Sequence, residues 1–349
     1  MVANMQQKCS YHAFFELVVS LAFVVLFVTG TPCMHAQDAS LSDLNLKEAG
    51  NFITALAIDK QNRLWVGAED KGVSVLENDK WKNFGADILN ESNCTALAIT
   101  PGQTVWAGTV RHGIFVFAEN KWKQIGILQG LPGVHVYALA PDMRHKNGVL
   151  CATEGGLCSV VLDEAKTNFA IEILPEPELS DGSSIREFAA LVPHVRKGLF
   201  WAGALIGGIG FSDGRGWKMY EFDSQSVGGQ INSMLLDRSN RVWAAAKHGL
   251  FRFDYKTGSW RNVVNENVAK VSITDPYFTS ICEDNKGRLW LGTRRHGLCR
   301  YDPQFGMWQR IKKSVSDRFV SALCLDRDGK LWVGAYGKGL CRINPETIK

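Results

Sequence analysis

The sequence lacks the motifs that mark several large classes of protein. Its 349 residues contain no nucleophile elbow, no P-loop, no H-E-x-x-H and no C-x-x-C pair. This weighs against the hydrolases, nucleotide-binding proteins and zinc proteins that are built on those motifs. Charge of one sign is also scarce, because the net charge is only +4, too small to indicate nucleic-acid binding. We therefore expect no metal, no cofactor and no nucleic-acid partner.

Long hydrophobic runs are almost absent as well. The exception is residues 17–30, where Lys8 and Glu16 are the only fixed charges upstream. This run is shorter than the roughly 20 residues that span a membrane, and it suits the h-region of a secretory signal. We expect a signal peptide over residues 1–36, cleaved after Ala36, and a periplasmic or secreted bacterial protein without a membrane span in the mature chain. An uncleaved anchor and lipidation at Cys33 are the alternatives.

What the sequence does contain is an internal repeat. The frame of residues 53–59, Ile-Thr-Ala-Leu-Ala-Ile-Asp, recurs from residues 94, 136, 188, 231, 278 and 320. The first position of each copy is apolar and the third is always Ala or Ser. A period of roughly 40–50 residues is typical of propeller blades. The small third residue suits an innermost strand, because seven such strands crowd around one axis.

Tryptophan marks two further positions of the repeat. One lies in a second strand, at Trp65, Trp106, Trp201, Trp243, Trp290 and Trp332, with Cys151 in the third copy. The other lies in a fourth strand, at Trp81, Trp122, Trp217, Trp260 and Trp308. We expect an all-β fold, a seven-bladed β-propeller over residues 37–349 with four-stranded blades and buried Trp side chains between them. The last copy stops after three strands, so residues 41–48 are expected to add an N-terminal strand that closes the last blade.

Seven cysteines follow residue 36, and an exported protein meets an oxidising compartment. Cys282 and Cys324 stand where other copies have Ala, Val or Leu, while Cys299 and Cys341 replace Phe. A bridge from the first to the third strand of a blade would span roughly 9.6 Å, beyond disulfide reach. We therefore expect small core residues, with a bridge between the last two blades as the alternative.

Two turns in each repeat carry polar residues. The turn between the first and second strands starts with Asp in four clear copies and has Asn or Gly three residues later. Asp accepts backbone N–H bonds and Asn or Gly tolerates positive φ, so this pattern indicates a hairpin. Asp326 and Asp328 resemble part of a calcium loop, but the remainder of such a loop is missing from the sequence.

The turn between the second and third strands is rich in basic residues and His. In a propeller it shares one face with the links between blades and with the mouth of the central channel. Converging basic and aromatic side chains there suit an anionic ligand such as an acidic sugar; the alternative is a set of solvated turns. Histidines of copies two, five and six are spread too widely around a ring to share a metal. The candidate ligand-binding residues are Arg111, His112, His135, Lys247, His248, Tyr277, Arg294, Arg295, His296, Arg318, Tyr336 and Lys338.

Two links between blades are long, at residues 174–184 and 263–275. Long loops on a rigid scaffold often carry function, although they can also be tolerated insertions.

The repeat, apolar-x-Ala-Leu-x-x-Asp-x-x-Gly/Asn-x-Leu-Trp-Val-Gly-x-x-x-x-Gly-Leu-x-Arg-Tyr, resembles the two-component regulator propeller repeat. The clearest copies are residues 53–76, 231–253, 278–301 and 320–343, whereas the third and fourth copies depart from it. In that family such propellers form the periplasmic sensing region of hybrid sensor kinases that respond to glycan fragments. The sequence shows no kinase part, so the resemblance implies recognition alone.

Taken together, these features predict an exported, monomeric, non-catalytic propeller. We expect it to bind an anionic glycan or an envelope partner at the channel-mouth face. A sensor kinase acting in trans is a further partner that the resemblance implies. A polysaccharide or cyclic-ester lyase on the same scaffold is one alternative. Such an enzyme would need a general base and a cation clustered at the mouth, for which His112, His135, His248 and His296 are the candidates. A protein-interaction scaffold is the other alternative.

Overall fold

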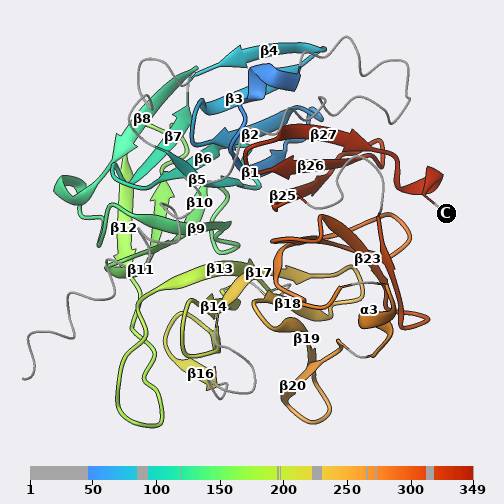
Figure 1. Ribbon diagram of the computed structural model, residues 1–349. Coiled ribbons are helices and arrows are strands. Elements are labelled where there is room, and N and C mark those ends of the chain that lie inside the picture. Colours follow the sequence, from blue (N-terminus) through green and yellow to red (C-terminus); the bar gives the residue numbers. More distant parts are fainter. Residues whose placement is uncertain are drawn as a thin grey trace, which may run out of the picture. The chain divides into compact units, whose positions relative to one another are not determined.

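The structure is a computed structural model that describes residues 46–84, 93–118, 120–194, 196, 198–221, 230–264, 266–271, 273–311 and 318–348. The expected signal peptide lies outside these residues. The described part confirms an all-β propeller with seven antiparallel sheets, one for each repeat (Figure 1).

The first four blades have four strands each. Blade one consists of β1 (Ile53–Ile58), β2 (Leu64–Ala68), β3 (Gly72–Glu77) and β4 (Lys80–Asn83). Blade two consists of β5 (Cys94–Ile99), β6 (Val105–Thr109), β7 (Ile114–Ala118) and β8 (Lys121–Ile125). Blade three consists of β9 (Val136–Pro141), β10 (Gly148–Thr153), β11 (Gly156–Leu162) and β12 (Phe169–Ile173). Blade four consists of β13 (Phe188–Pro193), β14 (Phe200–Ala204), β15 (Ile209–Ser212) and β16 (Trp217–Tyr220).

The last three blades follow the same order. Blade five consists of β17 (Ile231–Leu236), β18 (Val242–Ala246), β19 (Gly249–Asp254) and β20 (Ser259–Asn262). Blade six consists of β21 (Phe278–Glu283), β22 (Leu289–Thr293), β23 (Leu298–Asp302) and β24 (Met307–Arg310). Blade seven has β25 (Val320–Leu325), β26 (Leu331–Ala335) and β27 (Gly339–Ile343). The described helices are short: η2 (Leu46–Ala49), η3 (Ile127–Gln129), α3 (Glu266–Lys270) and η4 (Pro345–Thr347).

The innermost strands begin at the seven positions that the repeat predicts. Each innermost strand contacts that of the next blade, from β1 to β5 and onward to β25, which returns to β1. In Figure 1 these strands gather around the centre of the ring. Hydroxyl groups reinforce the contacts, since Thr54 Oγ1 donates to the Cys94 carbonyl and Thr95 Oγ1 to the Val136 carbonyl, both at 2.6 Å.

The ring closes between blades seven and one. Ser321 Oγ donates to the Ile53 carbonyl, and the Gly339 amide donates to the Asn51 carbonyl at 2.9 Å. Phe52 and Tyr336 form an isolated antiparallel bridge. The described end of the expected closing strand differs from the prediction, because residues 46–49 form the 3₁₀ helix η2, which contacts β27. Residues 41–45 lie outside the described residues.

Apolar side chains pack mainly between adjacent blades. Trp65 of blade one, for example, lies in one buried cluster with Val105, Phe115 and Trp122 of blade two. A glycine two residues after several of these Trp residues lets the next blade approach. At Gly292 an added Cβ would lie 2.7 Å from Val320 Cγ1. The small and aromatic columns of the repeat therefore have complementary roles at the interfaces between blades. The prediction that Cys151 stands in the Trp column of blade three is wrong, because Leu150 is the residue that pairs with the fifth position of the innermost strand, Ala140.

The Asp of the first turn is a structural residue. In blade six, Asp284 Oδ1 accepts the amides of Lys286 and Arg288, and Oδ2 accepts the Trp290 indole N–H at 2.8 Å. Blades one, five and seven repeat the Asp–Trp bond at 2.8–3.0 Å. The predicted positive φ is present at Asn62 (61°) and Gly287 (76°). These carboxylates are thus engaged by their own hairpins.

All seven cysteines after residue 36 are free thiols in the structure. Five of them are buried and two, Cys282 and Cys324, are half-buried. This confirms that they pack as small interior residues.

Candidate functional site

One face of the ring carries the links between blades. On this face, a backbone hydrogen bond joins the same two positions in every blade. The amide of the residue after the second strand donates to the carbonyl of the residue before the innermost strand; for Arg294 and Tyr277 the distance is 3.1 Å. Because innermost strands lie nearest the axis, these pairs surround the channel, and we call them the mouth ring. They are Glu69–Phe52, Val110–Asn93, Glu154–His135, Leu205–Glu187, Lys247–Gln230, Arg294–Tyr277 and Tyr336–Phe319.

Aromatic residues fill one side of the mouth ring. Tyr277, Phe319, Tyr336 and Phe52 come from blades six, seven and one, and we call them the aromatic arc. The Tyr336 ring lies 5.0 Å from the Phe52 ring and 5.5 Å from the Phe319 ring. Phe52 and Phe319 remain 37% and 36% exposed. A row of half-exposed rings beside a channel offers flat apolar faces to a ligand.

Charged groups flank the aromatic arc. The Arg294 guanidinium lies 5.3 Å from the centre of the Tyr277 ring, and the exposed Lys247 belongs to the neighbouring pair. On the other flank, the Tyr336 hydroxyl donates to Glu69 Oε2 at 2.7 Å. Burial raises the pKa of Glu69 despite this hydrogen bond. The arc therefore joins a cationic to an acidic part of the ring.

The acidic part continues in blades three and four. The Tyr137 hydroxyl donates to Glu187 Oε1 at 3.1 Å, and the His135 ring lies 4.4 Å from the Tyr137 ring. Glu154 accepts the amides of Val134 and His135. Burial, followed by the Glu187 carboxylate, raises the pKa of Tyr137, so the phenol keeps its proton and donates it. The mouth ring as a whole is polarised rather than uniformly basic.

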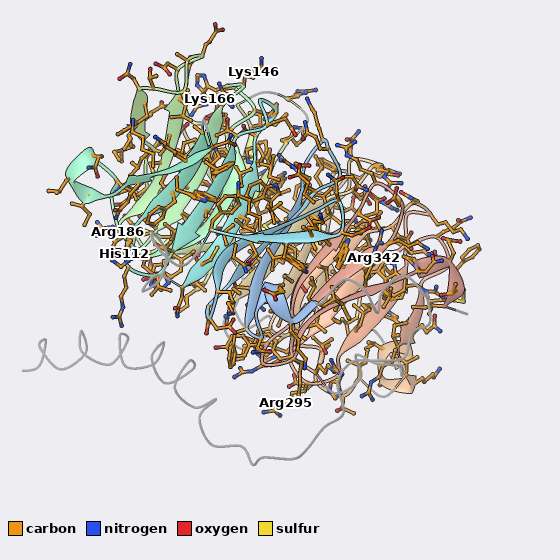
Figure 2. All side chains as sticks on the ribbon, turned by 90° about the horizontal axis from the view of Figure 1, so that it is seen from above. His112, Lys146, Lys166, Arg186, Arg295 and Arg342 are labelled. Atoms are coloured by element: carbon orange, nitrogen blue, oxygen red, sulfur yellow. The ribbon has the colours of Figure 1, made fainter. Side chains whose placement is uncertain are left out.

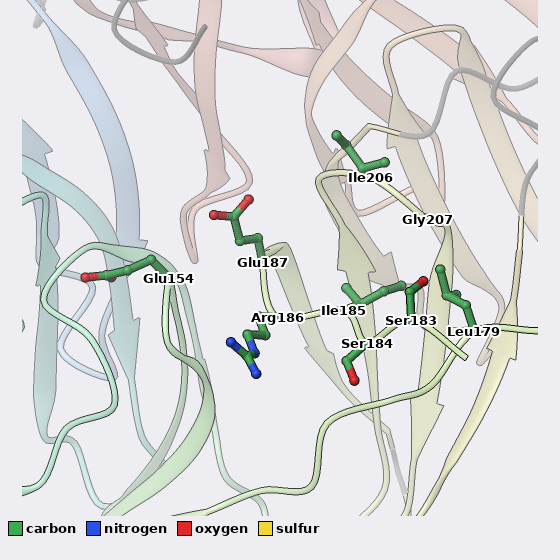
Figure 3. A pocket seen from close by; sticks show the side chains of 9 residues that line it. All are labelled: Glu154, Leu179, Ser183, Ser184, Ile185, Arg186, Glu187, Ile206 and Gly207. Atoms are coloured by element: carbon green, nitrogen blue, oxygen red, sulfur yellow. The ribbon is translucent and has the colours of Figure 1, made fainter. Parts of the chain in front are cut away.

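A cavity of about 630 Å³ adjoins this acidic part (Figure 3). Glu154, Glu187 and Ile206 line it together with the end of the long link, residues 183–186. The link is held in place, because Arg186 pairs with Glu176 at 2.8 Å and Ser180 bonds to Glu221. The first long link therefore forms a wall beside the mouth, as a functional loop would.

A smaller cavity of about 330 Å³ lies at the outer part of blade two. Arg111 and His112 line it together with Gln124 and the η3 link, in which Leu128 is 96% exposed. In the side-on view of Figure 2, His112, Arg186 and Arg295 lie along one side of the ring, and Lys146 and Lys166 along the other.

The structure divides the predicted site residues into two groups. His135, Lys247, Tyr277, Arg294 and Tyr336 belong to the mouth ring. The others lie in the turns and links around it: Arg111, His112, His248, Arg295, His296, Arg318 and Lys338. His112, His248 and His296 come from three different blades, and no group of three or more metal-binding side chains occurs among the described residues.

Sequence reasoning missed Phe52, Phe319 and Glu187. All three stand immediately before an innermost strand, so the repeat offered a signal in the column just ahead of its first apolar residue. That column lies outside the repeated frame, and only His135 and Tyr277 of it are among the predicted site residues.

Comparison with known proteins supports the repeat type. A family model described as two component regulator propeller matches residues 47–70, 272–295 and 314–337. No protein of curated function matches the chain in sequence. Each matched segment begins before an innermost strand and ends in the turn after the second strand, so it contains both halves of a mouth-ring pair.

Solved structures with the same fold include the extracellular domain of a two-component system and other proteins. The extracellular domain of a putative hybrid two-component system of B. thetaiotaomicron is 18% identical, with a TM-score of 0.68 over 86% of this chain. The chain spans only 40% of that structure. Virginiamycin B lyase from Staphylococcus aureus is 10% identical, with a TM-score of 0.61 over 84% of this chain and 94% of the lyase. YCF48 from Cyanidioschyzon merolae is 13% identical, with a TM-score of 0.59 over 85% and 96%.

At these identities the solved structures establish the fold alone. No described helix is long and apolar enough to cross a membrane. The repeat matches and the seven blades together identify the chain as a seven-bladed β-propeller that contains two-component regulator propeller repeats.

Proposed function

We propose that this protein is an exported recognition propeller that binds a glycan at the mouth ring. The observation that carries the proposal is the aromatic arc, because half-exposed rings beside a channel can stack on the apolar faces of sugar rings. The extracellular sensor domain of similar fold supports a recognition role. A signal that follows glycan binding would then pass through a partner in the envelope.

The charges suggest where an acidic sugar would lie. Arg294 and Lys247 flank the Tyr277 end of the arc, and both are exposed. A carboxylate or sulfate placed there would gain charge-assisted hydrogen bonds, whereas Glu69 at the opposite end would repel it. We therefore expect binding of anionic glycans to weaken at high salt.

The test is a glycan-array screen of the purified protein at two salt concentrations, beside three variants. Phe319→Ala removes one ring of the arc, and Arg294→Ala removes the cation. Lys146→Ala, on the opposite side of the ring, is the matched control (Figure 2). We expect the control to bind like the wild type, Phe319→Ala to lose binding at both salt concentrations, and Arg294→Ala to lose the salt-sensitive part.

A folded protein that binds no glycan would refute the proposal and favour a protein partner. Binding that survives Phe319→Ala would place the site away from the arc. Circular dichroism of every variant establishes that the ring is folded in each comparison.

A lyase is the second candidate, and one observation favours it. His135, Tyr137, Glu154 and Glu187 form a group of acid and base side chains beside the 630 Å³ cavity. Virginiamycin B lyase shares the fold. Turnover of a cyclic ester or an acidic polysaccharide that is lost on Glu187→Gln would establish this activity, whereas absence of turnover in the presence of binding would exclude it.

A further inference from the structure

Blade three has cysteine at two positions that face each other. The ladder places Leu150 of β10 in the column that holds Trp in the other six blades, because Leu150 pairs with Ala140, the fifth residue of the repeated frame. Cys151 lies in the next column, which holds Val, Ala or Leu in the other blades. Its partner across the ladder is Cys158 of β11. In the other blades the residue opposite this column is Ser74, Phe115, Gly210, Phe251, Cys299 or Cys341. Cysteine occurs opposite this column in blades six and seven as well, but among the described ladders the column itself holds cysteine only in blade three, which puts two thiols in register.

The register places the two thiols within bonding range. Opposite residues of an antiparallel pair have Cα atoms about 4.5–5.5 Å apart, and disulfides span Cα distances of about 4.4–6.8 Å. The Cys151 and Cys158 side chains lie in one buried cluster. A tight turn at Glu154 and Gly155 joins the strands, and the Gly155 amide donates to Thr153 Oγ1 at 3.2 Å. The hairpin itself therefore brings the two sulfurs together.

The other cysteines have different neighbours. Across their ladders, Cys94, Cys282, Cys299, Cys324 and Cys341 face Thr, Trp, Leu, Trp and Val, respectively. Cys282 and Cys324 direct their S–H groups to backbone carbonyls. Among the described ladders, only the one between β10 and β11 pairs two cysteines.

We propose that Cys151 and Cys158 are the site of a disulfide that cross-links blade three when the protein folds in an oxidising environment. Each thiol loses its proton, one S–S bond forms, and the two electrons and two protons reduce the disulfide of an oxidant to two thiols. The oxidant is oxidised glutathione or a disulfide-carrying oxidoreductase. Both side chains are 0% exposed in the folded ring, so the exchange takes place before blade two covers them.

The cross-link would stabilise a blade that has Leu150 in place of the buried Trp of its neighbours. The two thiols lie against Trp106, Val149 and Val160 in the interface with blade two. A bond between adjacent strands restricts the unfolded chain over a short loop and stabilises the blade accordingly.

The sequence between the two cysteines allows a direct test, because Glu154 is the only site there for a glutamate-specific protease. The full chain is refolded in a mixture of oxidised and reduced glutathione, denatured, blocked with N-ethylmaleimide and digested without reductant. We expect the fragment that ends at Glu154 and the one that begins at Gly155 to stay joined until dithiothreitol is added. Recovery of both cysteines as separate maleimide adducts would overturn the proposal.

Three variants make the test specific. Cys151→Ala and Cys158→Ala should each leave the remaining partner cysteine alkylated, and Cys94→Ala, at another buried position, should keep the joined fragments. Dithiothreitol should lower the unfolding temperature of the wild type by a few degrees and leave that of Cys151→Ala unchanged. Joining of Cys158 to several other cysteines would indicate random oxidation and would also overturn the proposal.

Discussion

The buried carboxylate of Asp284 offers the sharpest test of how the blades are held. Its side chain is 1% exposed and accepts four hydrogen bonds, from the Lys286 and Arg288 amides, from Arg288 Nε at 2.6 Å and from the Trp290 indole at 2.8 Å. Asp284→Ala would leave the Trp290 N–H and two backbone amides without this acceptor. Water can reach the turn amides but not the indole, because Trp290 is 0% exposed.

The expected cost follows from these contacts. A buried donor left without a partner costs about 1–3 kcal/mol, and removal of one member of a buried ion pair about 3–5 kcal/mol. Since Arg288 keeps Glu346 as a second partner at 3.2 Å, we expect a loss of about 3–5 kcal/mol in total. With an unfolding entropy of about 2.1 cal/mol/K per residue over about 300 residues, the unfolding temperature should fall by about 5–8 °C.

Two matched variants separate the causes. Asp284→Asn keeps one oxygen acceptor and the shape while removing the charge, so its loss should be smaller, about 1–2 kcal/mol. Asp213→Ala removes a turn carboxylate that bonds only backbone amides at an exposed position, and it should hardly change the unfolding temperature. Urea and thermal unfolding followed by far-ultraviolet circular dichroism measure all three. An Asp284→Ala protein within 1 °C of the wild type would refute the reasoning.

Blades two and four show that the ring folds without the Asp–Trp hydrogen bond in every blade. The indole nitrogens of Trp106 and Trp201 are buried and have no hydrogen-bond partner among the described residues. Their turns begin with Thr100 and His194 in place of Asp. We therefore expect the Asp284→Ala protein to be destabilised but folded, so that its free energy of unfolding can be measured.

Three further predictions concern pH, packing and ring closure. Despite burial, hydrogen bonds hold the pKa of Asp142 and of Asp284 below the ordinary value. The contribution of these carboxylates to the stability of the fold is therefore complete above about pH 4 and is lost as the pH falls through the folded-state pKa. Urea midpoints should drop between neutral pH and about pH 3, and a rise would contradict this. Gly292→Val places a side chain against Val320 and should cost about 1–3 kcal/mol in urea unfolding, whereas an unchanged midpoint would show that blades six and seven can separate. Ser321→Ala removes the hydroxyl that bonds the carbonyl at the start of β1 and should cost about 1 kcal/mol, measured by thermal unfolding; no loss would mean that this bond does not hold the ring closed.

The regular features of the ring could be predicted because they are local or periodic. The positions at which the innermost strands begin follow from the recurrence of one frame, and the burial of the Trp side chains follows from their column. Positive φ at Asn62 and Gly287 follows from the chemistry of a four-residue turn. Each of these depends on residues within one repeat, so one chain segment contains all the information.

The composition of the mouth could not be predicted in the same way. Basic turn residues suggested a cationic face, but the pairs nearest the axis include Glu69, Glu154 and Glu187. Phe52 and Tyr336 are nearly 300 positions apart in the sequence, and only closure of the ring brings their rings within 5.0 Å. The described part of the expected closing strand, residues 46–49, is a 3₁₀ helix that contacts β27 and β4. These strands are distant from it in the sequence, so the repeat alone did not predict its conformation.

The sequence by itself determined the number of blades, their strand order and the hairpins that join them, because a repeat specifies the same local structure each time it occurs. The tertiary structure alone decided which side chains meet: the aromatic arc, the polarised mouth ring and the facing thiols of Cys151 and Cys158. Those contacts depend on ladder register and on the closure of a ring, and both are properties of strands that pair in space rather than of any single stretch of chain.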